Sequence, residues 1–250
     1  MSLLGDSSRD WRRTRLVGPV MGMTFAGLAL LVLLSIFLVQ RFDIVAAERE
    51  QVLVEQGFER QIEELDAVVA TQVDWDDAIT ALDHKFDPEW ADFNVGNYLY
   101  TFNGFTHSYV LDRDERPIYA AVRGERAPLS SFARFEGAAR RMVPLIRQAE
   151  LWRGTILPRP GKNNIVIPPI QRNAIVSIGG QTYIVSATLV QPDFGKVLPK
   201  GPRAPIVIAA KPIDAGMLKS FSRRYLLDNL LLLGPTAQPA GRSVIELRDM

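Results

Sequence analysis

The 250-residue sequence contains no cysteine, which excludes disulfide bonds, cysteine-based zinc sites and thiol nucleophiles. Its two histidines, His84 and His107, have no partners at metal-ligand spacing. The net charge of +1 offers no basic field, so we expect no nucleic-acid partner. The sequence also lacks a Gly-rich phosphate loop and a Gly-x-Ser-x-Gly elbow. Because these motifs are missing, we expect no catalytic residue, no metal ion and no cofactor.

Charge is absent from residues 16–39, whereas the segment before them holds four arginines. At about 1.5 Å per residue, an uncharged helix of this length crosses a hydrocarbon core of about 30 Å. Positive residues mark the cytoplasmic side of such a helix. We therefore expect a cytoplasmic N-terminus over residues 1–15, a transmembrane helix over 16–40, and a remainder that lies outside the cytoplasm.

A cleaved signal peptide is the alternative interpretation of this apolar run. Val45-Ala46-Ala47 resembles a small-residue cleavage site. The apolar region of a signal peptide spans roughly 7–15 residues, however, and this run is longer, which favours a retained anchor. The next most apolar stretch, Tyr225–Gly234, is too short to span and contains polar residues. We therefore expect a single membrane pass in this sequence.

Residues 41–70 favour a helix, because they are rich in Glu, Gln, Val, Leu and Ala. Apolar residues recur there at spacings of three and four, which predicts one apolar stripe along a stalk helix. The stripe packs either on its own domain or on a second copy of the chain, which would form a homodimer through the stalk. It consists of Val54, Phe58, Ile62, Leu65 and Val69.

Residues 71–250 alternate short helical and strand-like segments, which indicates one α+β domain. A polar turn at residues 112–116 and the pair Gly179-Gly180 predict two β-hairpins. The element order is that of a PAS-like domain, a five-stranded antiparallel sheet with helices on one face. The predicted helices cover 74–82, 88–93, 130–153 with Ser130 or Ser131 as N-cap, and the segment from the cap Asp214 to Arg224. The predicted strands cover 106–111, 117–122, 174–178, 181–189, 205–210, 226–233 and 242–247, with long loops over 155–172 and 191–203.

An acidic cluster around two tryptophans is the densest polar feature of the sequence. Three interpretations stay open: the acids bind a cation or another ligand, an acid pair performs hydrolysis, or the tryptophans pack while the acids cap helices and bind backbone groups. The glycine of a calcium loop is absent, and no acid on a second element completes a hydrolytic pair. The cluster consists of Asp74, Trp75, Asp76, Asp77, Asp83, Asp87, Trp90, Asp92 and Asn94.

Part of this cluster resembles the CHASE family of extracellular sensory domains, in its fourth class. The family pattern is a tryptophan followed by paired aspartates on a helix, a later asparagine, and a strand that ends in an aspartate before a turn. The order of cytoplasmic tip, anchor and periplasmic domain is also similar. The family often has an aromatic residue before the tryptophan, where this chain has Val73-Asp74. The matching residues are Trp75, Asp76, Asp77, Ala78, Asn94, Asp112, Arg113 and Asp114.

The resemblance implies an input module in a bacterial inner membrane, with the bulk of the chain in the periplasm, that senses an unknown small ligand or periplasmic protein. It also implies a second transmembrane helix and a cytoplasmic output domain beyond residue 250. In this family that domain is most often a cyclic di-GMP cyclase or phosphodiesterase, and sometimes a histidine kinase. The alternative function is that of a membrane-anchored structural or assembly protein without a ligand; a periplasmic hydrolase lacks a candidate nucleophile. The residues expected to form the ligand site or its scaffold are Trp75, Asp76, Asp77 and Asn94.

Overall fold

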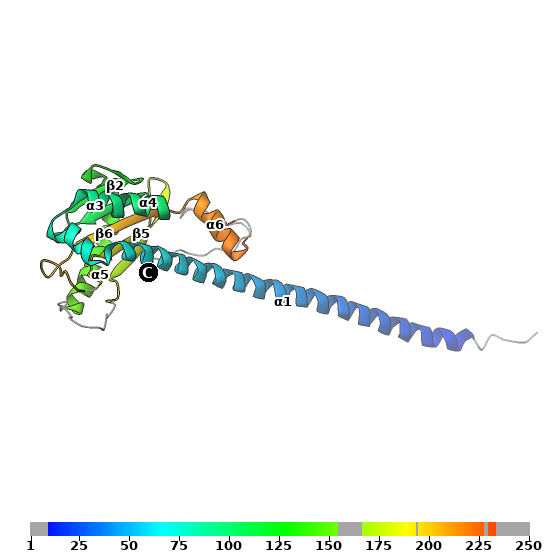
Figure 1. Cartoon of the computed structure of the whole chain (residues 1–250). Coiled ribbons are helices and arrows are strands. Elements are labelled where there is room, and N and C mark those ends of the chain that lie inside the picture. Colours follow the sequence, from blue (N-terminus) through cyan, green and yellow to red (C-terminus); the bar gives the residue numbers. More distant parts are fainter. Residues whose placement is uncertain (1–9, 155–166, 194, 228–229, 234–250) are drawn as a thin grey trace, which may run out of the picture. The chain divides into compact units, whose positions relative to one another are not determined.

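The computed structural model describes residues 10–154, 167–193, 195–227 and 230–233. The chain divides into two compact units, residues 1–53 and 54–250. The first unit contains the start of helix α1 (Asp10–Val73), drawn in blue in Figure 1. Within it, Met21–Leu38 is exposed, has a mean hydropathy of 2.3, and is long and apolar enough to cross a membrane. This stretch lies inside the transmembrane helix expected from the sequence.

The second unit is built on a six-stranded sheet in which every neighbouring pair runs antiparallel. The order across the sheet is β3-β2-β1-β6-β5-β4. The two halves of the domain join where β1 pairs with β6. The strands are β1 (His107–Leu111), β2 (Pro117–Val122), β3 (Glu125–Arg126), β4 (Gln171–Ile178), β5 (Gln181–Leu189) and β6 (Ile206–Pro212).

Both predicted hairpins are confirmed, and local residues explain their turns. Between β1 and β2, Asp112 Oδ1 accepts hydrogen bonds from the backbone N–H groups of Asp114 (2.8 Å) and Arg116 (2.9 Å). Between β4 and β5, Gly179 and Gly180 have φ angles of 59° and 81°. A primed two-residue turn requires this left-handed backbone, which glycine adopts without steric cost.

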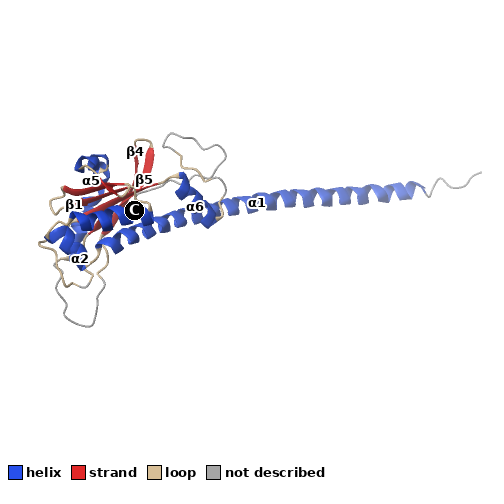
Figure 2. Cartoon of the chain, turned by 45° about the horizontal axis from the view of Figure 1, so that its top comes forward, coloured by secondary structure: helices blue, strands red, loops and turns tan. Residues whose placement is uncertain are grey.

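Helices cover both faces of the sheet. Figure 2 shows α5 on one side of the red strands, with α1 and α2 on the other. On the α1 side lie α2 (Asp76–Ile79), η1 (Thr80–His84), α3 (Pro88–Ala91), η2 (Asp92–Asn97), α4 (Tyr98–Asn103) and α6 (Ala215–Tyr225). On the other side lie η3 (Leu129–Arg134) and α5 (Glu136–Arg153).

Two separate hydrophobic cores result from this arrangement. The α1-side core packs the end of α1 and the short helices onto Val110, Ile184 and Val207. The α5-side core packs the inner side of α5 onto residues that alternate with these, such as Tyr109 and Val185. The alternation follows from the two-residue period of a strand, which sends successive side chains to opposite faces.

The apolar stripe of the stalk packs on its own domain. Ile62, Leu65 and Val69 are at most 4% exposed and belong to the α1-side core. Helix α6 lies against the same part of α1: the rings of Phe58 and Phe221 are 6.1 Å apart in an edge-to-face arrangement. The homodimer stays a prediction, and the buried part of the stripe is not free to form its interface.

Several predictions about single elements are wrong. Ser130 and Ser131 lie inside η3, so they do not cap α5, which is preceded by Phe135. The strand predicted over 226–233 does not appear in its described residues. The one predicted over 242–247 lies outside the described residues. By contrast, Asp214 caps α6 as predicted, and its carboxylate accepts a hydrogen bond of 2.8 Å from the N–H of Met217.

The sheet and its cover also differ from the sequence expectation. The described residues form six strands instead of five, because the short β3 adds to β2 at one edge of the sheet. Helices lie on two faces instead of one. The sequence pattern predicted α5 as a helix, but the face of the sheet that α5 covers depends on contacts that form only in the folded chain.

Candidate functional site

The four predicted site residues lie on the α1 side of the domain, in different environments. The Trp75 side chain is 38% exposed, and its Nε1 donates a hydrogen bond to the Thr71 carbonyl one turn earlier in α1. Asp77 is exposed in the first turn of α2. Asn94 Nδ2 donates to the Trp90 carbonyl at 3.0 Å, a contact within its own helical segment. Trp75 therefore lies outside both cores, and the contact of Asn94 is local.

Several other acids of the cluster fasten helices. Asp87 accepts hydrogen bonds from the N–H groups of Glu89 (3.0 Å) and Trp90 (3.1 Å), so it caps α3. Asp92 forms an ion pair with Arg126 of β3. These contacts support the interpretation that the acids cap helices and bind backbone groups.

Asp76 and Asp83 tie the short helices to the loop before β6. Asp76 Oδ2 accepts a hydrogen bond of 3.3 Å from the Lys196 N–H. Asp83 accepts one of 2.6 Å from the Lys200 N–H and forms an ion pair of 2.7 Å with Arg113. Residues 195–203 are thereby held against α2 and η1 by acidic side chains of the sequence cluster.

Asp74 has the most perturbed environment of the cluster. Burial raises the pKa of its carboxyl to about 7; the charge of Arg153 and a hydrogen bond with Gln191 oppose the rise, and the charge of Asp193 adds to it. Arg153 Nη1 donates to Gln191 Oε1, and burial lowers the pKa of the guanidinium. A carboxyl that titrates near 7 beside a guanidinium changes its charge readily when a ligand approaches.

Unpaired polar atoms accumulate around Asp74. Asp74 Oδ1, Asp76 Oδ1 and Arg153 Nε are buried and have no hydrogen-bond partner in the part of the chain that the structure describes. Leaving such a group unpaired costs about 1–3 kcal/mol. We call this group the junction cluster, because it lies where α1 ends and α2 begins. It consists of Asp74, Asp76, Arg153, Gln191 and Asp193.

The junction cluster offers both signs of charge and unpaired donor and acceptor atoms, which suits a polar ligand. The described residues contain no group of three or more His, Asp and Glu side chains that could hold a metal ion. Sequence reasoning identified Asp74 and Asp76 but missed Arg153, Gln191 and Asp193. Gln191 and Asp193 fell in a segment interpreted only as a loop, and no sequence signal links Arg153 at the end of α5 to Asp74.

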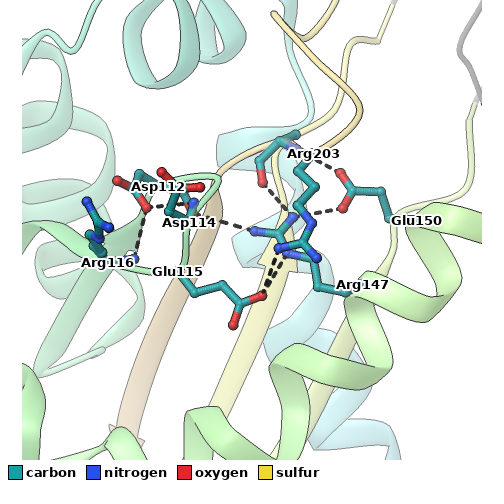
Figure 3. A network of polar contacts seen from close by, with 8 residues as sticks. Asp112, Asp114, Glu115, Arg116, Arg147, Glu150 and Arg203 are labelled. Carbon is teal, nitrogen blue, oxygen red and sulfur yellow. Dashed lines mark hydrogen bonds and ion pairs between the residues drawn. The ribbon is translucent and has the colours of Figure 1, made fainter.

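A second polar network lies on the α5 side and has a structural role. Figure 3 shows Arg147 between Glu115 and Glu150. Arg147 Nη1 lies 2.8 Å from Glu150 Oε2 and also donates to the Ala204 carbonyl at 2.8 Å. Glu150 Oε1 accepts a hydrogen bond of 2.7 Å from the Ala204 N–H. These contacts join α5 to the β1–β2 turn and to the segment before β6, and they satisfy both oxygens of Glu150.

Comparison with known families identifies one match. The model of the CHASE4 domain matches residues 57–233, which include the sheet, the junction cluster and α6. This match confirms the resemblance that the Trp-Asp-Asp motif and the hairpin indicated. No curated protein sequence matches the chain.

Proposed function

Because the chain belongs to the CHASE4 family, the extracellular sensory domains of signalling receptors, we propose that it is the membrane-anchored input module of such a receptor. The domain lies in the periplasm of a bacterial cell and binds a small ligand or a periplasmic protein. Binding changes how the end of α1 packs on the domain, and α1 passes this change toward the inner membrane.

The position of the junction cluster is the observation that carries the proposal. Asp74 directly follows Val73, the last residue of α1, and Val73 is fully buried in the α1-side core. A ligand that binds Asp74 or Arg153 therefore acts on the end of a helix whose packing is already fixed by neighbouring core residues. The same helix contains the apolar stretch Met21–Leu38.

We assign the ligand contacts to the junction cluster and to the residues beside it. Trp75 contributes an exposed ring, and Asp77 contributes an exposed carboxylate on the first turn of α2. Asp76 has one oxygen without a partner in the described chain. Asn94 acts as scaffold, because its side chain donates to the Trp90 carbonyl.

The output of the receptor is the synthesis or degradation of cyclic di-GMP, and two copies of the chain pair along α1. Val52 and Leu53 are exposed apolar residues of α1 that a second copy would cover. In-frame deletion of codons 57–233 from the native gene should change the cellular cyclic di-GMP concentration. Asp74→Asn should change it in the same direction, and the exposed turn variant Asp114→Asn should not. An unchanged cyclic di-GMP concentration in the deletion strain would contradict the proposed output.

The predicted topology has its own test. Alkaline phosphatase fused after Met250 should be active, because the enzyme needs the periplasm and residues from 41 onward are expected there. A reporter that requires the cytoplasm should be inactive at the same position. The reverse pattern would contradict the sensor function entirely.

A protein partner instead of a small ligand is favoured by one surface feature. Leu151 and Trp152 at the end of α5 are 77% and 79% exposed. Trp152→Ala should abolish the cyclic di-GMP response if a periplasmic protein docks there. A response that survives in Trp152→Ala but not in Asp74→Asn would favour the small ligand.

A further inference from the structure

A second group of buried polar side chains lies between α1 and the strands β4 and β5. Asp66 of α1 is 4% exposed, and Ser186 and Thr188 of β5 are fully buried. Asn173 Nδ2 of β4 donates a hydrogen bond of 2.8 Å to Asp66 Oδ2. These residues lie outside the junction cluster and have no part in the contacts described for it.

Strand register brings the polar side chains of β4 and β5 together. Asn173 pairs with Ser186, and Gln171 pairs with Thr188. Residues two apart on a strand face the same side of a sheet. Ile184 and Val190, at the same alternation on β5, belong to the α1-side core. Ser186 and Thr188 therefore face α1, where Asp66 lies.

The group is rich in hydrogen-bond acceptors without partners. Asp66 Oδ1, Ser186 Oγ, Thr188 Oγ1 and Gln171 Oε1 are all buried and unpaired within the described part of the chain. Buried polar atoms are normally hydrogen-bonded, so four such atoms on one side of one sheet need an explanation. All four can accept a hydrogen bond, and the carboxylate and amide oxygens can only accept unless Asp66 is protonated.

The charge of the group points to the same type of ligand. Burial raises the pKa of Asp66; the polar side chains of Ser186 and Asn173 beside it oppose the rise, and the negative charge of Glu63 adds to it. No Lys or Arg among the described residues forms an ion pair with Asp66. An ionised Asp66 therefore lacks the positive charge that a buried carboxylate requires.

We propose that this group is a binding site for a protonated amine. An ammonium head has three N–H donors and one positive charge. It would donate to Asp66 Oδ1 and to the oxygens of Ser186, Thr188 or Gln171, and it would neutralise Asp66. One consequence of the inference rests on the proposed sensory function: the cationic ligand then changes the packing of α1. The binding itself is independent of that function.

Methylammonium is the smallest organic probe of this site, and the full chain in detergent micelles is the protein to test. At about ten times its Kd, methylammonium should raise Tm by roughly 3–6 °C. Tetramethylammonium has the same charge but no N–H donor, so it should have no effect at equal ionic strength. Sodium and potassium chloride serve as the salt controls. An equal rise with sodium that Asp66→Asn removes would overturn the amine class in favour of a metal cation.

Substitutions locate the site. Asp66→Asn keeps the shape of the side chain and should weaken methylammonium binding at least tenfold, whereas Glu59→Gln, an exposed acid on the same helix, should not. If Asp66→Asn fails to fold, Thr188→Val and Ser186→Ala carry the test, since each removes one acceptor and should weaken binding severalfold. A methylammonium shift that persists in all these variants would overturn the proposal.

The readout separates this inference from the proposed function. Binding by the purified chain without any change of cyclic di-GMP in cells would support the amine site and contradict its role in signalling. Absence of a specific shift with methylammonium would overturn the amine site, and the response of cells to Asp74→Asn would be unaffected by that result.

Discussion

The two faces of the sheet are both covered by helices, but they bury different kinds of side chain. On the α5 side, Phe135 is fully buried among aromatic rings, with centroids 4.9 Å from His107 and 5.3 Å from Tyr183. Burial lowers the pKa of His107 to about 4, and the charges of Arg134 and Arg123 act in the same direction. His107 therefore packs as a neutral ring, and this face serves stability.

The α1 side combines an apolar core with buried polar groups. Val69 and Val73 are fully buried there, and so are Ser186 and Thr188, whose hydroxyls lack partners in the described chain. Burial raises the pKa values of two carboxyls on this side, Asp66 and Asp74. A protein that kept this face only for stability would have little use for such groups. The difference supports the proposal that the α5 side provides stability and that the α1 side responds to a ligand.

The largest expected effect is on the α5 side. Phe135→Ala should lower the free energy of unfolding by about 3–5 kcal/mol, because it removes a large buried side chain and leaves a cavity. Chemical unfolding of the full chain in micelles measures it. Phe93→Ala, at a residue that is 69% exposed, is the matched control and should change little. Equal losses in the two variants would contradict the assignment of the α5 core.

A smaller loss is expected for the buried ion pair of the same face. Arg147→Met should cost about 3 kcal/mol, because it leaves the Glu150 carboxylate, 4% exposed, without its cation. Arg140→Met breaks an exposed pair with Glu136 and should cost less than about 1 kcal/mol. If both substitutions had the same small effect, the network in Figure 3 would contribute nothing to stability.

On the α1 side, Asp74 should make stability depend on pH. Its pKa is about 7 in the folded chain and 3.8 when unperturbed, so the folded state binds the extra proton between these values. The stabilisation is complete below about pH 4 and is lost progressively as pH rises to about 7, by an amount on the order of 4 kcal/mol. Asp74→Asn should flatten this slope, which unfolding at a series of pH values would reveal. If Asp74→Asn left the pH dependence of the unfolding free energy unchanged, a group other than Asp74 would cause it.

The smallest effect is expected for Trp75. Because its ring is 38% exposed and outside both cores, Trp75→Ala should cost about 1 kcal/mol, well below the loss for a buried tryptophan. Trp90 packs against the α1-side core, so Trp90→Ala should cost more, about 2 kcal/mol. Thermal melts of both variants decide the order. If Trp75→Ala lost more stability than Trp90→Ala, Trp75 would be a packing residue, as one interpretation of the sequence predicts.

Much of the domain could be predicted because its signals are local. The glycine pair in the β4–β5 turn, the cap Asp214 and the apolar run before residue 40 each act through neighbours in sequence. The errors occur where local signals compete. Ser130 and Ser131 are favourable cap residues, yet both lie inside η3. Helix α5 starts only after Phe135, whose side chain is fully buried.

The sequence by itself determined the apolar helix near the N-terminus, the α+β class and the two hairpins, and it left open whether the acids fasten the short helices. Only the tertiary structure decided which acids became functional candidates. Nothing in the sequence distinguishes Asp66 from Asp83. In the structure, Asp83 pairs with Arg113 and accepts a hydrogen bond from the Lys200 N–H. Asp66 is buried beside Asn173, and no Lys or Arg among the described residues forms an ion pair with it. The pKa and reactivity of a carboxyl depend on burial and on partners distant in sequence, and folding alone brings these together.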